Sequence, residues 1–519
     1  MTSRKPETPS QPKISRRQLV LAGGLAVATA RSAIAQTPVP IANVPLLRIA
    51  VSRLPDAMDP AGTMHPDHLW LDTLTLDSPN RWNAGGTVLG AIMQRMSTSE
   101  FDEEFDLVIR PGALFHTGRP VNADDVRYTL ERIRNGSGDR QHQWRLEHVR
   151  HLRTVDPTTL RVTLERPDSS LSASLAHQAF GILPSGTDPN DIVGGTGPFV
   201  LQAHTRDQRW YARNPFFWQF ARPRIDALQV VPIEDDARRA TSIAQGEIDV
   251  LPNVPLLDIP MLREDPTSYL AGGPSNLVCL LQVNLAVPAL RDVRVRRLIS
   301  RAIDRQGLVD VATAGQATPT GLLYPADSWV GGEVDDVDAL PSESIRQELR
   351  LLGIPTDLRL RLLTNNADAT LANTAVVLQE QLASCGIALS VDLLEDADLE
   401  EAIRLRDYDL LATYTEPWRD PHELVRPLLV AGGTRNFSGY ADEQVEALVR
   451  GAILREDRAF RRERYALIEQ AVQEDVPVIV LFHPHTYDAI SSRVAGYTAL
   501  PPVTARGLLT VQPEAAPDG

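Results

Sequence analysis

The chain has 519 residues, a formal net charge of −15 and a mean hydropathy of −0.17. Because an acidic chain repels phosphate groups, nucleic acids and anionic membrane surfaces are poor partners for it. The length exceeds what a single hydrophobic core usually supports, so two or three lobes are expected.

The first 35 residues are predicted to be an export signal. Ser15–Val20 places paired arginines ahead of an apolar run from 19 to 30, and Ala33 and Ala35 are the small residues that a signal peptidase reads. The pair resembles a twin-arginine signal; an ordinary secretory signal with a chance arginine pair is the alternative. Residues 1–35 carry a net charge of +5, so cleavage after Ala35 changes the net charge from −15 to −20. No cysteine near that site could carry a lipid anchor, and a soluble protein of the periplasm is expected.

The elements that follow are marked by local patterns. Leu46–Val51 reads as an opening strand, whereas the elements between Met64 and Met96 cannot be placed. A short strand at Leu107–Arg110 ends at a Pro-Gly turn, and Asn122 is placed to cap a helix. The inward face of that helix is predicted to carry Val126, Leu130 and Ile133.

Five further elements are predicted downstream. The segment from Thr159 to Glu165 alternates as a strand does. A helix follows Asp292, and its arginines are expected on a solvated or salt-bridged face opposite Val295, Leu298, Ile299, Ala302 and Ile303. A second helix ends at Gly386 and leads into a strand, and the run from Pro477 to Phe482 is typical of a buried strand.

Few residues of this chain indicate covalent or metal chemistry. Cys279 and Cys385 lie in apolar surroundings and are predicted to be buried thiols rather than a disulfide. Three histidine pairs at 65/68, 148/151 and 483/485 lack a third nearby ligand, so no metal and no cofactor is expected. The chain contains no G-x-S-x-G, no H-E-x-x-H and no phosphate loop with lysine, so an enzyme has no positive support.

The stretch LVIRPGALFHTGRPVNADDVRYTLERI from Leu107 to Ile133 resembles a family signature. That signature, LR-x-G-x-x-F-H-D-G-x-x-x-x-A-x-D-V, belongs to family five of the extracellular solute-binding proteins, the peptide/nickel class serving ABC importers. Thr117 departs from it, because this position usually carries an acid or Asn. The GTGPF turn at Gly195–Phe199 and the block from Val283 to Arg305 also resemble family motifs, in the family's order.

The resemblance implies an α/β fold of the type II periplasmic-binding-protein kind: bilobed, with mixed sheets, a two-strand hinge and an extra inserted domain. The implied division is lobe I at 36–75, 195–280 and 486–519, inserted domain II at 76–194, and lobe III at 281–485. The hinge strands are expected near Leu277–Asn284 and Val478–Tyr487. The ligand would be enclosed between lobes I and III by closure about that hinge.

The segment from Tyr414 to His422, YTEPWRDPH, is the most informative about the ligand. In peptide-binding members the equivalent reads W-x-x-D-x-x-D-P, and the first acid pairs with the peptide α-ammonium. Pro417 stands at that acid, with Glu416 as the nearest substitute. The segment also resembles the W-G-A-P-Y-D-P-H loop of the nickel-chelate binder, and Arg140–Trp144 resembles its R-Q-R-H-A-W segment. The histidine that completes nickel ligation has no counterpart between Val430 and Phe437.

These similarities and the residue types yield a set of candidate ligand contacts. Aromatic rings can stack on a ligand, and charged groups can hold its charges. The alternatives are that the aromatic residues pack in the core and that the acid before Pro421 caps a helix. The stacking candidates are Trp144, Tyr414 and Trp418, the charged and polar candidates are Arg140, His142, Glu416 and Asp420, and the motif block adds Asn284.

The leading hypothesis is a periplasmic substrate-binding protein of an ABC importer. It would be a monomer that captures a small solute, a peptide or peptide-like compound, and delivers it to an inner-membrane ABC permease complex. A nickel-chelate or metallophore receptor is the alternative, followed by an exported peptide hydrolase on the same scaffold. A sensor or chaperone-like receptor without a permease also remains open.

Overall fold

The computed structural model describes residues 46–512 except 56–57, 63–64, 99–102, 137–139, 191–193, 333, 335, 355–357 and 501–503. The predicted signal peptide with its cleavage site at Ala35 lies outside the described residues. All the described residues belong to one structural unit, which comprises residues 43–519. Within the described residues, no helix has both the length and the apolar character needed to cross a membrane.

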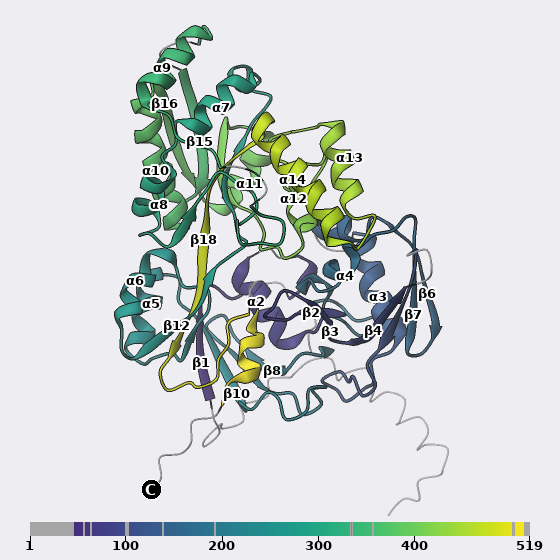
Figure 1. The fold of residues 1–519 in the computed structure, drawn as a ribbon. Coiled ribbons are helices and arrows are strands. Elements are labelled where there is room, and N and C mark those ends of the chain that lie inside the picture. The colour runs from purple at the N-terminus through teal and green to yellow at the C-terminus, as the bar shows by residue number, and fades with distance from the viewer. Residues whose placement is uncertain are drawn as a thin grey trace, which may run out of the picture. The chain divides into compact units, whose positions relative to one another are not determined.

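A mixed sheet of twelve strands runs through the protein (Figure 1). Ten strands follow the order β16-β15-β17-β13-β18-β11-β1-β10-β9-β8, and β12 and β14 pair with β18. The N-terminal half of the sheet contains β1 Leu46–Val51, β8 Phe199–His204, β9 Arg209–Arg213, β10 Ala227–Pro232, β11 Val250–Leu251 and β12 Ser268–Pro274. The other half contains β13 Cys279–Val283, β14 Ala317–Pro319, β15 Leu358–Asn365, β16 Ile387–Leu394 and β17 Leu410–Tyr414. Strand β18, Val478–Ser491, belongs to both.

Strand β18 joins the halves because it pairs with each of them in turn. Its first part pairs antiparallel with β13, from Gln282 opposite Val478 to Cys279 opposite Phe482. Its second part pairs with the whole of β12, from Pro274 opposite His485 onward. Among the described residues, the only other direct strand-to-strand passage in this region is the short connection 275–278 between β12 and β13. The hinge predicted at these two segments, and the lobe boundaries predicted from the sequence, stay predictions.

Helices cover both halves of the sheet. Beside the N-terminal half are α2 Pro66–Thr75, α5 Asp236–Ala244, α6 Ile259–Glu264, and the short 3-10 helices η1 Pro60–Gly62, η5 Leu256–Asp258 and η7 Ala505–Thr510. Beside the other half are α7 Val293–Arg301, α8 Arg305–Ala312, α9 Ser342–Leu351, α10 Ala369–Ser384, α11 Asp396–Leu405, α12 Pro421–Leu429, α13 Glu443–Ala452, α14 Arg458–Asp475 and η6 Pro288–Leu290. Separate apolar clusters lie in each half, so each half has its own core.

A four-stranded sheet in the order β4-β5-β7-β6 lies apart from the large one. Its helix α3 begins where the sequence predicts, because the Asn122 side chain accepts from Asp125 N while the Asp125 carboxylate accepts from Asn122 N. The predicted inward face of α3 is confirmed, since Val126, Leu130 and Ile133 are buried. The elements of this region are β2 Asn80–Trp82, β3 Val88–Gly90, β4 Met93–Thr98, β5 Glu104–Ile109, α3 Ala123–Arg134, η2 Arg140–Leu146, β6 Val149–Asp156, β7 Thr159–Leu164, α4 Leu171–Ser174 and η3 Gln178–Phe180.

The predicted arginine face of α7 is partly wrong. Arg296 of α7 and Arg305, the first residue of α8, are buried, and they donate to the backbone carbonyls of Asp475 and of Val480 in β18. Long side chains can satisfy buried carbonyls in this way, so a basic residue in an amphipathic helix need not face water. The predicted thiols are confirmed, because Cys279 and Cys385 are both free and buried.

Candidate functional site

A cleft of about 1990 Å³ lies between the two halves of the large sheet. Its walls are the N-terminal ends of α2, α5 and α10, the end of β12 with the connection that follows it (residues 271–277), the segment 413–419 and the β18 residues 484–488. The cleft therefore adjoins both passages between the halves. Its volume exceeds that of a usual small-molecule site, which is about 300–1,000 Å³.

The cleft is acidic because its walls contain helix starts. Twelve carboxylates and five guanidiniums line it. Some of the acids are caps: Asp235 accepts from Arg238 N at the start of α5, and Asp368 accepts from Leu371 N at the start of α10. Others are paired, such as Asp396 with Arg53 at 2.9 Å. The excess of carboxylates favours cationic or neutral ligands over anions.

Three of the predicted contact residues line this cleft. Tyr414 ends β17, and burial holds the pKa of its hydroxyl well above the usual range, so the hydroxyl is neutral. The Glu416 side chain is 11% exposed and lies between two guanidiniums, at 3.5 Å from Arg145 and 3.4 Å from Arg435. The Glu416 carboxylate is thus held in place by two guanidinium groups before any ligand enters.

Trp418 is both a wall of the cleft and a part of the core. It is 2% exposed, and its ring meets Tyr324 edge-on at 6.0 Å. Its carbonyl accepts from Asn276 Nδ2, whereas its buried indole nitrogen has no hydrogen-bond partner among the described residues. Trp418 therefore packs in the core, as the alternative to ligand stacking supposed, and it also lines the cleft.

Of the other predicted residues, the four whose side chains are described line neither this cleft nor the pocket beside it. Asp420 caps α12 and is paired with Arg461 at 2.6 Å, and Asn284 donates to the carbonyls of Arg406 and Tyr408. His142 is 1% exposed, with its ring 4.7 Å from that of His177. Trp144 is buried beside His422, and Arg140 begins η2 with a side chain outside the described residues.

Sequence reasoning missed Arg145, although it directly follows Trp144. Arg145 is 2% exposed and donates to Glu423 at 2.6 Å. Burial raises the pKa of the Glu423 carboxyl, and Arg145 counteracts that rise. The pair joins η2 to α12, and its residues are 278 positions apart in the chain. A contact between such distant residues cannot be predicted from a local sequence pattern.

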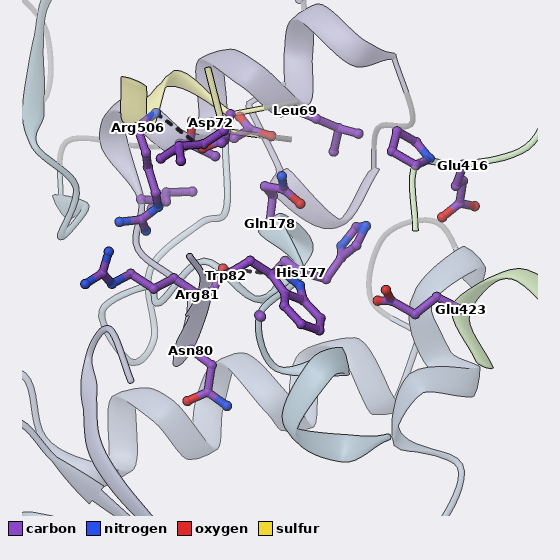
Figure 2. Close-up of a pocket in the computed structure, with 17 residues that line it drawn as sticks. Leu69, Asp72, Asn80, Arg81, Trp82, His177, Gln178, Glu416, Glu423 and Arg506 are labelled. Carbon is purple, nitrogen blue, oxygen red and sulfur yellow. Dashed lines mark hydrogen bonds between the residues drawn. The ribbon is translucent and has the colours of Figure 1, made fainter. Parts of the chain in front are cut away.

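A smaller pocket of about 50 Å³ adjoins the cleft (Figure 2). The two share Glu416, Pro417, Leu500 and Thr504 as walls. We call it the side pocket. The α2 residues Leu69, Asp72 and Thr73 line it together with Leu76, which directly follows the helix, and the spacing of the first three places them on one face of α2. Figure 2 shows Glu416 and Glu423 toward one end and Arg81 and Arg506 toward the other.

The histidine pairs have structural partners. The His65 ring accepts from Asp67 N at the start of α2, His148 contacts Asp168 at 3.2 Å, and His483 contacts the Leu322 carbonyl at 2.8 Å. Among the described residues, no group of three or more His, Cys, Asp or Glu side chains is arranged to hold a metal ion.

Comparison with known proteins places this geometry in context. The family described as "Bacterial extracellular solute-binding proteins, family 5 Middle" matches residues 88–436. The peptide transport periplasmic protein SapA of Salmonella typhimurium is 24% identical over 75% of this chain and 76% of that protein. The glutathione-binding protein GsiB of Escherichia coli K12 is 24% identical over 76% of this chain and 81% of that protein.

Solved structures share the fold. The PBP AgaA of A. tumefaciens R10 in complex with agropinic acid has a TM-score of 0.81 and 22% identity, covering 91% of this chain and 99% of that one. DppA of Helicobacter pylori in complex with the peptide STSA has a TM-score of 0.80 and 19% identity, covering 91% and 98%. NikA of Staphylococcus aureus in complex with Ni(L-His)2 has a TM-score of 0.78 and 18% identity, covering 89% and 98%.

Proposed function

Since this chain belongs to the bacterial extracellular solute-binding proteins of family 5, we propose that it is a periplasmic receptor for short peptides or peptide-like compounds. It binds the solute between the two halves of the large sheet and passes it unaltered to an inner-membrane ABC permease. The curated relatives SapA and GsiB, named for peptide transport and glutathione binding, support this class of ligand.

The observation that carries the proposal is the cleft of about 1990 Å³. Its walls come from both halves of the sheet, which within the described chain are joined there by the connection 275–278 and by β18. A ligand in this position touches both halves at once, so its binding energy favours the arrangement that closes on it.

Within the cleft, Tyr414 and Trp418 supply aromatic surface and Glu416 supplies charge. Because Glu416 is held by Arg145 and Arg435, its orientation is fixed before the ligand arrives. We assign Asp420, His142, Trp144 and Asn284 to supporting roles, since each is buried and either bonded to or packed against protein groups.

Native mass spectrometry of the protein purified from its own periplasm tests the proposal. We expect a retained mass that fragmentation identifies as a short peptide or a peptide-like compound. A retained metal–organic complex would replace the ligand class with the nickel-chelate alternative. Shortened products accumulating from a peptide mixture incubated with the purified protein would instead indicate the hydrolase alternative.

Replacement Glu416→Gln tests the charged contact. Arg145 keeps its closer partner Glu423 at 2.6 Å, so the fold should be spared. We expect affinity for the retained ligand to fall by about tenfold or more, the loss typical of one charge-assisted hydrogen bond. Titration calorimetry measures it. The control Glu147→Gln removes a carboxylate that pairs with Arg426 and lines neither cavity. Equal affinities of the two variants would remove Glu416 from the site.

A further inference from the structure

Among the buried carboxyl groups in the described part of the chain, only that of Asp72 has no hydrogen-bond or ion-pair partner. Nine Asp and Glu residues are buried there. Eight have partners: Asp67 with Ser52, Asp77 with Arg506, Asp125 with Arg119, Asp168 with His148, Asp249 with Arg48, Asp420 with Arg461, Glu423 with Arg145 and Glu469 with Leu323 N. The side chain of the ninth, Asp72, accepts no hydrogen bond from a described residue, and its Oδ2 is fully buried.

A buried polar group without a partner costs free energy, so each such group calls for an explanation. Asp72 is 7% exposed and lies on the face of α2 that lines the side pocket (Figure 2). The pocket opens beside the cleft at Glu416 and Pro417, which are walls of both. A carboxyl group without a protein partner therefore belongs to the wall of a pocket that shares two of its walls, Glu416 and Pro417, with the cleft.

The size of the side pocket limits what it can hold. A site for one water needs roughly 10–15 Å³ on the same measure, so about 50 Å³ accommodates only a few non-hydrogen atoms. A guanidinium or an ammonium with its last methylene fits this space. A whole amino acid residue does not, so the rest of the ligand must stay in the cleft.

The charges around Asp72 come from several neighbouring elements. Arg209 of β9 lowers the pKa of Asp72 and Asp59 raises it, whereas Tyr211 faces it with a neutral phenol. In the pocket wall, Glu416 and Glu423 are paired with Arg145, and Arg506 is paired with Asp77. Arg81 is the remaining cation of the wall, and it does not act on Asp72. Burial and Arg145 hold the pKa of His177 well below its usual value, so that ring is uncharged.

We propose that the side pocket is a specificity subsite for a cationic head group, a guanidinium or primary ammonium at the end of a ligand side chain, with the Asp72 carboxylate as its counter-ion. The inference rests on the proposed function and narrows its substrate class to peptides or peptide-like compounds with a basic side chain.

Burial raises the pKa of the empty site's Asp72 to about 8, so the carboxyl group holds a proton at neutral pH. A cationic head group stabilises the ionised form and lowers that pKa on binding. Binding at pH 6.5 should therefore release close to one proton per ligand. Because a neutral head group does not ionise Asp72, its binding should release none.

A matched pair of ligands tests the subsite. One library contains peptides of two to five residues with a single arginine, and the other has citrulline at the same position, which replaces the guanidinium by a neutral urea of similar shape. Native mass spectrometry with each library should show retention of arginine peptides over citrulline peptides by about tenfold or more. In Asp72→Asn this preference should fall to within about threefold, whereas Asp106→Asn, a β5 carboxylate outside both cavities, should keep it.

Proton release by the unmodified protein provides a second test that does not depend on a variant's folding. Calorimetry with the best-retained arginine peptide in two buffers of different ionisation enthalpy measures it. Peptides retained without preference for arginine, or arginine binding without proton release, overturn the subsite while leaving the receptor function intact. If no peptide of either library is retained, the peptide class of ligand fails, and the subsite fails with it.

Discussion

At the scale of single residues, Asp72 links the subsite to stability. Burial raises the pKa of its carboxyl from 3.8 to about 8, so between these values the folded protein holds a proton that the unfolded chain has lost. Stability therefore falls as the pH rises through this window, and there is no such effect below about 4, where both states are protonated.

The replacement Asp72→Asn removes this dependence. We expect a higher Tm than that of the unmodified protein at pH 8, with the difference narrowing toward pH 5, as followed by circular dichroism. Asp106→Asn should instead lower the Tm at pH 8. The hydrogen bonds from Arg161 hold the pKa of Asp106 below its usual value, so the ionised carboxylate stabilises the folded protein and the amide does not. A Tm difference for Asp72→Asn that is the same at both pH values would contradict the buried, protonated carboxyl.

Residues also show where sequence reasoning succeeds. Asn122 was predictable as a cap because the whole capping box lies within four residues of chain. Trp418 was predictable only as an aromatic candidate for ligand contact, since its packing against Tyr324 joins residues far apart in the chain. For the same reason Trp418→Ala does not separate binding from folding: it would leave a large core cavity as well as remove a wall of the cleft.

At the scale of elements, the contact between η2 and α12 depends on one buried ion pair. In Arg145→Met the Glu423 side chain, 7% exposed, loses its guanidinium, and breaking such a pair costs about 3–5 kcal/mol. The matched variant Arg426→Met removes the pair with Glu147. The side chains of Arg426 and Glu147 are 17% and 29% exposed, so the loss of this pair should cost about 1 kcal/mol or less. Urea unfolding compares the two. Equal losses would show that the burial of Arg145 is not what makes the contact strong.

Among the elements, those with strong local signals were predicted and the others were not. Strand β1 was found with its observed ends, because Leu46–Val51 is a continuous β-favouring run. Helix α2 was missed, since its cap is a histidine ring accepting from Asp67 N rather than one of the usual capping side chains. The paired strands β2 and β3 have only three residues each, which is too short for a period to be read.

At the scale of the whole molecule, the two passages between the halves of the sheet set how the protein responds to a ligand. If the halves close about the connection 275–278 and β18, a solution of the protein with its identified ligand should give a smaller radius of gyration than the protein alone. Small-angle X-ray scattering measures this change. Glu416→Gln should keep the larger value when the ligand concentration lies above the Kd of the unmodified protein and below that of the variant. An unchanged profile with ligand shown to be bound would contradict closure.

The overall architecture was predictable from the order of the family motifs, and the family and fold implied by the resemblance are confirmed. The details of the site were not. The cleft joins segments as distant as Ser52 and Thr504, and the side pocket that Asp72 lines takes its other walls from four separate parts of the chain. Such contacts depend on tertiary packing between distant segments. The sequence around each residue therefore shows no periodicity or spacing from which the contact could be predicted.

Strand β18 is shared by both halves, and it lies far downstream of its partners β12 and β13 in the chain. Until residues 478–491 have been synthesised, β12 and β13 each present an open edge, and such edges readily pair with other chains. The two halves of the sheet can thus be joined only after this strand has been synthesised. A message truncated before this strand should yield an aggregating or degraded product rather than a working half.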